Sequence, residues 1–392
     1  TVTQLDLRTR CIKMKVPFAD LRPQFDCIKE KLLPDLEKIM QDGSFIGGYW
    51  VEAFEEAFAS YCGAKEAIGV ANGTDALVLA LKAIGVGHDD IVLTTPNTFF
   101  ATVEAILLIG AKPAFIDVDK ETLNMSGAVL RNALEDLFNA GYSSQVKAVI
   151  PVHLHGLPAD MSAIKKVADE FKIKIIEDAC QAQGSTYFGR KCGNLDSSFG
   201  CFSFYPGKNL GAFGDAGALI TNNVDLADKV RALRNHGQLV KHKHELIGTN
   251  SRLDSLQACV LLHKLKHLDV WNSWRRNVAK KYSEELGITV KVPIEPVGSI
   301  SNYHVYAIMV ANKQQRDFLA SNLKYSFGID TGVHYPIPIH KQPALSYYNS
   351  IAFPVAEEAA DTMLSLPMFF GITDEQVNYI TSSVSSLVSL NG

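Results

Sequence analysis

The sequence predicts an α/β protein whose large domain has three layers, with helices on both faces of a mostly parallel sheet, followed by a smaller C-terminal α+β domain. From about residue 67, short runs rich in valine and isoleucine alternate with stretches of helical periodicity. This alternation is typical of βαβ units, in which each helix returns the chain to the next parallel strand. After about residue 270 the regular alternation ends. We expect an extension or leader in residues 1–16, a large domain in residues 17–269 and a small domain in residues 270–392.

The expected sheet strands are short apolar runs, and most of them are followed by a helical pattern. Two later strands, at 199–205 and 217–222, are separated by a glycine-rich turn, so this turn should join neighbouring strands. A helical pattern at 225–237 ends in a glycine, and a long helical pattern runs from about Leu253 to Glu285. The strands expected before them are at 66–71, 90–95, 112–118, 146–154 and 173–178, with helices at 74–85, 100–110 and 162–172.

The composition favours small-molecule chemistry in a reducing compartment. The chain has 392 residues and a formal net charge of -4, without a block of basic residues, so neither a nucleic acid nor a membrane surface is expected as a partner. No apolar run approaches the roughly 20 residues that span a bilayer. The 7 cysteines are odd in number and form no C-x-x-C pair, which argues against a disulfide framework and a zinc site. We therefore expect a cytoplasmic protein.

The segment VANGTDAL, residues 70–77, ends a strand and begins a helix. Gly73 allows the backbone to approach a ligand closely, and Thr74 adds a hydroxyl group to the free N–H groups of the helix N-terminus. Such a helix end can bind phosphate. Capping of the helix by Asn72 or Thr74 would explain the same residues without a ligand. The segment lacks G-x-x-x-x-G-K-[ST], so it is not a nucleoside triphosphate loop.

The segment IIEDACQAQGS, residues 175–185, carries two carboxylates out of an apolar strand. Because side chains alternate along a strand, Glu177 and Asp178 should point to opposite faces, and only one of them can enter a given pocket. A carboxylate at the mouth of a parallel sheet needs a cationic partner, such as a protonated pyridine nitrogen or the cation of a salt bridge. Gln181 follows at a spacing that could reach a ring substituent.

Lys208 lies on the turn between the two later strands, in FYPGKNLGAFGDAG. A lysine amine in an enclosed site has a lowered pKa and can act as a nucleophile, whereas most lysines are simply solvated. Phe99 adds an aromatic side chain at another strand end. Together these segments offer a phosphate seat, a carboxylate for a ring nitrogen, an aromatic side chain and a reactive amine. Pyridoxal 5'-phosphate requires these groups.

The motifs resemble those of the DegT/DnrJ/EryC1 family of sugar aminotransferases, which belong to the aspartate aminotransferase superfamily with PLP fold type I. The likeness extends from VPFADL at residue 16 to SLPM at residues 365–368. It implies that Lys208 binds the cofactor covalently, that Asp178 pairs with the pyridine nitrogen and that Gln181 lies near the ring. It further implies phosphate contacts from Gly73, Thr74 and Ser203, stacking by Phe99, and a phosphate contact from Asn250 to the neighbouring subunit of a homodimer.

The sequence departs from the family at two places. Relatives usually carry an aromatic residue at the position of His155, and a proline or small polar pattern at residues 48–50. Both departures concern the shape of the sugar pocket. His153 and His155 should share one face of a strand, but no third ligand stands at metal spacing, so no metal site is expected.

The resemblance implies transamination, with glutamate as the expected donor and a keto-sugar carried on a nucleotide as the acceptor. The dehydratase branch of the family has histidine at the lysine position, and Lys208 argues against it. A nicotinamide-dependent oxidoreductase is disfavoured because the glycine pair at residues 85 and 87 follows a helix and lacks the third glycine. A cofactor-binding regulator without turnover is a further alternative.

The segment GVHYPIPIHKQPAL, residues 332–345, resembles the branch that aminates C3, with His334 and Tyr335 beside the sugar. A uronate carboxylate calls for an arginine, and the loop LVKHKHELI, residues 239–247, contains none. Lys241 could still bind an acid as a point charge. The expected substrate is therefore a dTDP-linked 3-keto-6-deoxyhexose, used in amino-sugar biosynthesis. A UDP-linked 3-keto-uronate and amination at C4 are the alternatives.

Overall fold

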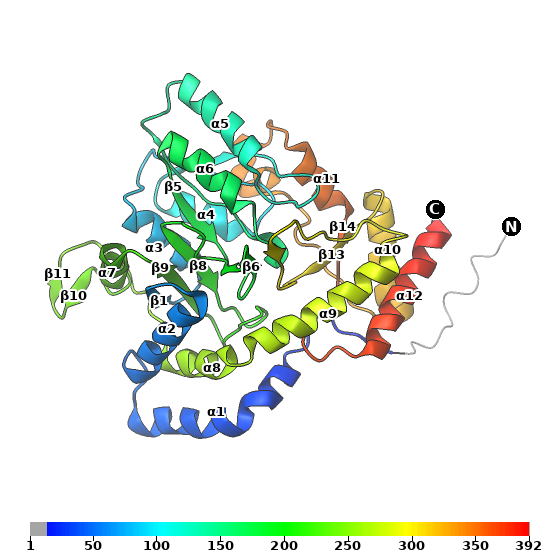
Figure 1. The fold of residues 1–392 in the computed structure, drawn as a ribbon, viewed down its shortest axis with the longest axis horizontal. Coiled ribbons are helices and arrows are strands. Elements are labelled where there is room, and N and C mark those ends of the chain that lie inside the picture. Colours follow the sequence, from blue (N-terminus) through cyan, green and yellow to red (C-terminus); the bar gives the residue numbers. More distant parts are fainter. Residues whose placement is uncertain (1–13, 392) are drawn as a thin grey trace.

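A seven-stranded sheet forms the centre of the computed structural model, which describes residues 14–391 (Figure 1). The strand order is β1-β9-β8-β5-β4-β2-β3. Only β9 runs antiparallel to its neighbours, β1 and β8, and the remaining pairs are parallel. The mostly parallel sheet is thus confirmed. Its strands are β1 (Glu66–Val70), β2 (Ile91–Thr94), β3 (Lys112–Phe115), β4 (Val146–Val149), β5 (Lys174–Asp178), β8 (Phe199–Ser203) and β9 (Gly217–Thr221).

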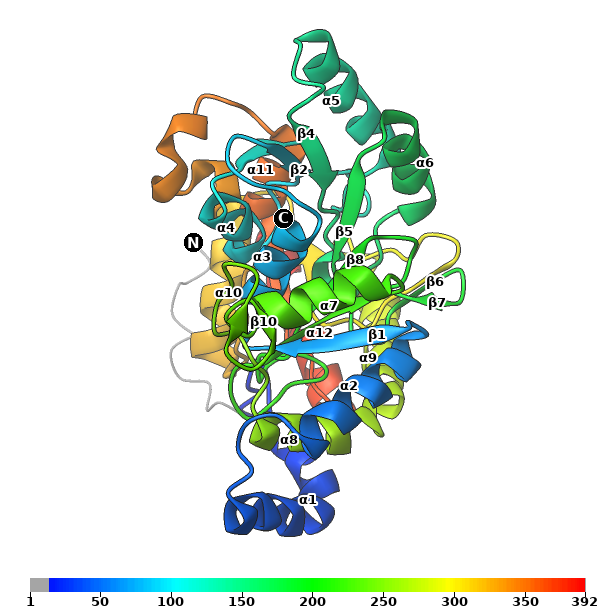
Figure 2. The ribbon, with the colours of Figure 1, turned by 90° about the vertical axis from the view of Figure 1, so that its left-hand side faces the viewer.

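Helices cover both faces of the sheet because neighbouring residues of each strand point to opposite sides. Ile175 of β5 belongs to the apolar core with α2, α5, α6 and α8, whereas Ile176 belongs to the core with α3, α4 and α7. In the view of Figure 2, α7 lies beside β1. The helices of these two layers are α2 (Tyr49–Cys62), α3 (Gly73–Ala83), α4 (Phe100–Leu108), α5 (Gly127–Asn139), α6 (Met161–Phe171), α7 (Val224–Leu233) and α8 (Ser255–Leu265).

The C-terminal part has its own apolar core, which includes Val16 from the N-terminal side. Val16 forms a parallel bridge with Ile329. The boundary near residue 270 stays a prediction, and most of the expected extension, residues 1–13, lies outside the described residues. The elements of this part are α9 (Leu268–Leu286), β13 (Tyr306–Met309), α10 (Lys313–Phe327), α11 (Pro354–Thr362), β14 (Met363–Leu366) and α12 (Asp374–Asn391).

The long helix expected from Leu253 to Glu285 is two helices, α8 and α9, separated at Lys266 and His267. The break follows from their packing. α8 packs against α2 and α1, which spans Arg22–Asp42, while α9 continues toward the C-terminal part (Figure 1). The single-helix prediction was wrong because an unbroken periodicity does not reveal a change of packing partner.

The remaining short elements lie outside the main sheet. None of the helices in residues 14–391 is both long and apolar enough to cross a membrane. The short strands are β6 (Thr186–Tyr187), β7 (Arg190–Lys191) and β12 (Ser299–Ile300), which form one small sheet, and β10 (Gln238–Val240) with β11 (Lys243–His244), which form a hairpin. The 3₁₀ turns are η1 (Leu154–Gly156), η2 (Ile339–Lys341) and η3 (Pro343–Tyr348).

Candidate active site

A cavity of about 620 Å³ opens where β5 and β8 end and α3 begins. It lies at the carboxyl ends of parallel strands, where ligands of open α/β sheets collect. Residues from distant parts of the sequence meet here, including Phe18 at the N-terminal side and Phe370 near the C-terminus. The structure brings together these sequence-predicted residues in the lining: Gly73, Thr74, Phe99, Asp178, Gln181, Ser203, Lys208, His334 and Tyr335.

The N-terminus of α3 forms one end of the cavity. Asn72 caps the helix by accepting a hydrogen bond from the Asp75 N–H at 2.8 Å. The N–H groups of Gly73 and Thr74 have no acceptor among residues 14–391. A Cβ atom on Gly73 would lie 2.7 Å from the Ser203 Cβ, so only glycine lets the helix end approach the strand end this closely. The result is a cradle of N–H and hydroxyl donors suited to an anion.

Asp178 ends β5 and reaches the cavity, although its side chain is largely buried. The Thr102 hydroxyl donates to Oδ2 at 2.8 Å, and the Cys180 N–H donates to Oδ1 at 3.2 Å. No cation pairs with Asp178 among the described residues 14–391. A buried carboxylate with acceptor capacity left toward a cavity suits a cationic ligand atom.

Glu177 points to the opposite face of β5, as expected from strand alternation. Its carboxylate accepts hydrogen bonds from the N–H groups of Gly193 at 2.6 Å and Leu195 at 2.9 Å, and from the Ser197 hydroxyl at 2.6 Å. His153 Nε2 lies 3.0 Å from the same carboxylate, and the Ala159 N–H donates to His153 Nδ1. His153 is therefore a neutral donor to Glu177 through Nε2. This network anchors the loop of residues 193–197.

The expectation that His153 and His155 share a strand face was wrong. β4 ends at Val149, and His155 lies in the 3₁₀ turn η1 with φ +59°. Its Nε2 lies 3.0 Å from the His334 carbonyl oxygen and donates to it. Burial lowers the pKa of His155 to about 4, so its ring is neutral at physiological pH.

Lys208 lies on the turn between β8 and β9. Its backbone N–H donates a hydrogen bond to the Tyr205 carbonyl oxygen at 2.8 Å. Its ammonium group forms no ion pair with any residue of the described range 14–391. Burial lowers the pKa of Lys208, and the neighbouring Cys180 and Asp178 partly oppose this effect. The cavity thus holds an amine that loses its proton more easily than a solvated lysine, which is what a nucleophile requires.

Gln181 links Tyr335 of the cavity to the turn η1. Its Oε1 accepts a hydrogen bond from the His155 N–H at 2.7 Å, and its Nε2 donates to the Tyr335 hydroxyl at 3.0 Å. The rings of Tyr335 and Phe99 lie 5.7 Å apart, and Phe99 is 56% exposed. Phe99 therefore presents a ring face that is not packed away. Burial lowers the pKa of His334 to about 4.

Two predicted residues do not line the cavity of this chain. Asn250 is exposed and forms a backbone bridge with Asn235. Lys241 is exposed in the turn of the β10–β11 hairpin. Both lie on a loop that carries exposed apolar side chains, among them Val240 and Ile247, which is 93% exposed.

Sequence reasoning missed several residues that line the cavity or contact its lining. Asn209 is buried directly after Lys208, and it contacts His304 and Asn272. Arg275 of α9 also lines the cavity, but its Nη1 donates to three backbone carbonyls, those of Tyr303, His304 and Met368. The position of Asn209 directly after Lys208 in the sequence could have identified it as a residue near the site. His304 and Arg275 stand in ordinary strand and helix patterns and have no local signal.

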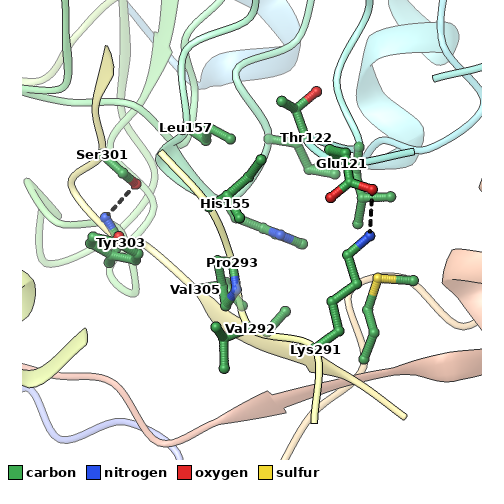
Figure 3. A pocket seen from close by; sticks show the side chains of 15 residues that line it. Glu121, Thr122, His155, Leu157, Lys291, Val292, Pro293, Ser301, Tyr303 and Val305 are labelled. Carbon is green, nitrogen blue, oxygen red and sulfur yellow. Dashed lines mark hydrogen bonds and ion pairs between the residues drawn. The ribbon is translucent and has the colours of Figure 1, made fainter. Parts of the chain in front are cut away.

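A second pocket, of about 50 Å³, is lined by His155 (Figure 3). Its walls come from residues 121–123, 154–157 and 291–309. Lys291 crosses it to Glu121, with the ammonium nitrogen 3.3 Å from the carboxylate (Figure 3). This volume has room for water-sized molecules only, so the larger cavity is the candidate active site.

The family model for the DegT/DnrJ/EryC1/StrS aminotransferase family matches residues 26–385. The chain belongs to this family. It is 41% identical, over 95% of its length and 98% of the relative, to a Geobacillus stearothermophilus protein named pleiotropic regulatory protein. It is 39% identical to the UDP-N-acetyl-3-dehydro-α-D-glucosamine 3-aminotransferase of Acidithiobacillus ferrooxidans, over 94% of its length and 97% of that enzyme.

A solved structure extends the likeness to the whole fold. The crystal structure of S. venezuelae DesV, determined with a ketimine intermediate, superposes with a TM-score of 0.90. The alignment covers 95% of this chain and 98% of DesV, at 36% identity. The chain is thus an aminotransferase-family protein with the α/β fold of PLP fold type I, as its sequence predicted.

The cofactor of this family is pyridoxal 5'-phosphate, and the residues of the cavity fit it. The cradle between Gly73 and Ser203 has N–H and hydroxyl donors for the phosphate. Asp178 keeps an acceptor oxygen near the cavity without a cationic partner among residues 14–391. Lys208 supplies an amine that forms no ion pair with a carboxylate in the described part of the chain. These donors and acceptors correspond to the phosphate, the ring nitrogen and the aldehyde of the cofactor.

Proposed function

We propose that this protein is an aminotransferase that moves an amino group from glutamate to C3 of a nucleotide-linked keto-sugar. The observation that carries the proposal is the position of Lys208. Its amine lies in the same cavity as Asp178 and the α3 cradle, and burial favours its neutral form. A neutral amine can act both as a nucleophile and as a base. The name of the Acidithiobacillus relative, a 3-aminotransferase, supports the choice of reaction.

Five residues of the cavity then have a role toward the cofactor. When bound, pyridoxal phosphate supplies an electron sink that stabilises negative charge on the carbon next to the transferred nitrogen. Gly73, Thr74 and Ser203 would hold its phosphate, and Phe99 would stack on its ring. The Asp178 carboxylate would keep a proton on the ring nitrogen.

Lys208 moves the proton that transamination requires. As a free amine, its Nζ would take the proton from the α-carbon of the donor and deliver it to the cofactor carbon bonded to the transferred nitrogen. The two half-reactions use one cavity in turn, so the kinetics should be ping-pong. Gln181 orients Tyr335 through its 3.0 Å hydrogen bond, which fixes one wall beside the reacting atoms.

We further propose that the acceptor sugar is neutral. The only arginine that lines the cavity in residues 14–391 is Arg275. Backbone carbonyls occupy its Nη1, and its Nε is sealed in the interior, so at most Nη2 can reach a ligand. A uronate carboxylate would therefore lack a free bidentate partner. The apolar side chains of Phe18, Met368 and Phe369 in the lining suit a 6-deoxy sugar, whose C6 is a methyl group. A dTDP-linked 3-keto-6-deoxyhexose is the proposed substrate, and His334 and Tyr335 are its proposed contacts.

We propose that two copies of the chain share their active sites. The exposed loop that carries Lys241 and Asn250 does not reach the cavity of its own chain. Its exposed apolar residues, such as Ile247, call for a covering surface. In a homodimer, Asn250 would bind the phosphate in the other copy, and Lys241 would lie near that copy's substrate.

The name of the Geobacillus relative raises a second candidate function, a cofactor-binding regulator without turnover. One spectrum distinguishes the two functions. Glutamate should bleach the absorbance of the cofactor bound to Lys208 in an aminotransferase, and the keto-sugar should restore it. If no amino donor changes the spectrum, the protein binds the cofactor without turnover.

Competition between acceptors tests the substrate. The dTDP-linked ketone and a UDP-linked 3-keto-uronate are supplied at equal concentration, and the amino-sugar products are identified by mass spectrometry. The dTDP-linked product should dominate. Preference for the uronate, lost on Lys241→Ala, would overturn the proposed substrate and support an acid-binding role of this loop. The position of the new amino group in the product distinguishes C3 from C4.

A further inference from the structure

His304 is held in the wall of the cavity by contacts on its ring, its N–H and its carbonyl group. Its Nδ1 lies 3.2 Å from Asn209 Oδ1, and its N–H donates to Asn302 Oδ1 at 2.9 Å. Arg275 Nη1 donates to its carbonyl oxygen at 3.3 Å. The residue before it, Tyr303, has φ +44°, a backbone conformation that costs free energy for a residue with a side chain. Several interactions therefore fix the orientation of this histidine.

The hydrogen bonds around Asn209 determine which ring nitrogen of His304 carries the proton. Asn272 Nδ2 donates to the Gln183 carbonyl oxygen at 2.9 Å, so Asn272 Oδ1 is an acceptor. Asn209 Nδ2 donates to that oxygen at 2.8 Å and to the Asn302 carbonyl oxygen at 3.0 Å. Asn209 Oδ1 is therefore the acceptor that faces His304. Because a neutral imidazole has one N–H, the proton is on Nδ1, and Nε2 has a free lone pair.

This free nitrogen faces the cavity. His304 lines the cavity beside Lys208 and Arg275. Its Nε2 has no hydrogen-bond partner in the described residues 14–391, and it is not among the polar atoms sealed in the interior. Burial lowers the pKa of His304 well below its usual value, and the charges of Lys208 and Arg275 lower it further. The ring stays neutral over the physiological range, so Nε2 remains a hydrogen-bond acceptor.

The surroundings select the kind of donor that Nε2 receives. A substrate ammonium would meet the positive charge of Arg275 at this wall, whereas a neutral hydroxyl would not be repelled. A substrate that lacks the matching donor would leave Nε2 buried without a hydrogen bond, and this weakens its binding. Such an acceptor therefore discriminates effectively between substrates with and without the hydroxyl group.

We propose that His304 Nε2 accepts a hydrogen bond from a hydroxyl group of the keto-sugar, and that His304 is a specificity-determining residue of the second half-reaction. This inference rests on the proposed aminotransferase function and adds a sugar contact to it. His304 does not take part in proton transfer. Its contribution is to recognise the sugar and to orient the ketone toward the transferred nitrogen.

Two substitutions separate this contact from the structural role of the ring. In His304→Asn, the amide nitrogen can replace Nδ1 as the donor to Asn209, but the acceptor at the position of Nε2 is lost. In His304→Gln, the amide can place an acceptor near the position of Nε2, but the donor to Asn209 is lost. His88→Asn is the control for a histidine substitution as such, because the side chain of His88 is 83% exposed.

The experiment measures the two half-reactions of the holoenzyme by the absorbance of its cofactor, with glutamate and then with dTDP-linked 3-keto-6-deoxyhexose. In His304→Asn, kcat/KM for the keto-sugar should fall about tenfold, the effect of losing one hydrogen bond worth about 1.4 kcal/mol, while the glutamate half-reaction stays unchanged. His304→Gln should lose less. If His304→Gln is impaired while His304→Asn is fully active, the ring of His304 has a structural role through Nδ1, and the proposal is overturned. An equal loss in both half-reactions would also overturn it.

Sugar analogues give a second measurement that does not depend on turnover. Calorimetry on the Lys208→Ala variant compares the binding of dTDP-sugars that each lack one hydroxyl group, with and without His304→Asn. One loss of affinity comes from His304→Asn and the other from removing the hydroxyl group that His304 contacts. These two losses should not add, because either change removes the same hydrogen bond. Full additivity for every hydroxyl would contradict the contact. If wild-type protein shows no half-reaction with any amino donor, the proposed function itself fails, and this outcome is distinct from all of those above.

Discussion

Gly73 and Ser203 come from different strand ends, yet they lie so close that a Cβ atom on Gly73 would be 2.7 Å from the Ser203 Cβ. The same atom would lie 3.2 Å from the Ser203 Cα, so rotation of the serine side chain cannot remove the clash. The N-terminus of α3 would have to move away from β8. This close approach brings the free N–H groups of the helix next to the serine hydroxyl, and it defines the proposed phosphate site.

Gly73→Ala should therefore weaken the binding of pyridoxal phosphate. The helix N-terminus and the Ser203 hydroxyl can no longer bind the same phosphate group in their present geometry. We expect a loss of about tenfold or more in cofactor affinity, measured by absorbance titration of the apoprotein, since one hydrogen bond to a charged group is worth about 1.5–3 kcal/mol.

Gly87→Ala is the matched control for Gly73→Ala. A Cβ atom on Gly87 meets nothing within 4 Å, and the backbone of Gly87 does not have a positive φ. Unchanged affinity in Gly87→Ala with a clear loss in Gly73→Ala would support the phosphate site. Equal affinity in the two variants would contradict it.

Lys208 should be the lysine that binds the cofactor covalently. Borohydride reduction of the holoenzyme should fix the cofactor on the peptide that contains Lys208, which mass spectrometry can identify. The reason is that its amine lies in the cavity without a carboxylate partner in residues 14–391. Lys264, which is buried in α8 and does not line the cavity, serves as the internal comparison. Label on Lys264, or on any lysine other than Lys208, would sink the assignment.

The sheet and part of the site could be predicted from the sequence because their signals are local. The Glu177–Asp178 pair illustrates this, since strand alternation alone sends the two carboxylates to opposite faces, and the structure has them so. The turn that carries Lys208 was likewise readable, because apolar runs on both sides of it indicate paired strands.

Other parts of the site could not be read because they depend on long-range contacts. Asn302 and His304 are about a hundred residues from Lys208, and no periodicity marks their contact with Asn209. His155 was assigned to a strand because the apolar pattern continues past Val149, where the strand ends. A one-dimensional pattern cannot show where the chain leaves a sheet when the following residues are also buried.

Two copies of the chain should complement each other if the active sites are shared. Mixed subunits that carry Lys208→Ala and Asn250→Ala should regain part of the activity, because in the heterodimer one of the two sites has both residues intact. Activity is measured after subunit exchange has been verified with differently tagged chains. Mixing Lys208→Ala with Lys208→Ala,Asn250→Ala is the control that should stay inactive. No recovery in the first mixture, despite exchange, would contradict shared sites.

Lys264 of α8 should make the stability of the protein depend on pH in the alkaline range. Its side chain is 1% exposed, and its ammonium group contacts only neutral partners in residues 14–391. Nζ donates to the Gly211 carbonyl at 2.7 Å, lies 3.4 Å from Gln24 Oε1 and stands 4.9 Å from the centre of the Phe213 ring. Burial lowers the pKa of Lys264 from 10.5 to about 8.

The sign of the effect follows from proton binding. Between pH 8 and 10.5 the unfolded chain holds the Lys264 proton more tightly than the folded protein. The free energy of unfolding therefore rises with pH through this window, and the full cost of the buried charge applies below it. At about 1.4 kcal/mol per pKa unit, the cost is on the order of 3 kcal/mol.

Lys264→Met removes this dependence while keeping a side chain of similar length. Chemical denaturation at a series of pH values should show that the wild-type protein gains about 3 kcal/mol relative to the variant between pH 8 and 10.5. Lys266→Met, at an exposed position just after the same helix, should follow the wild-type curve. If the curves of wild type and Lys264→Met run parallel, then Lys264 keeps its proton equally well in both states. Its burial would then carry no electrostatic cost.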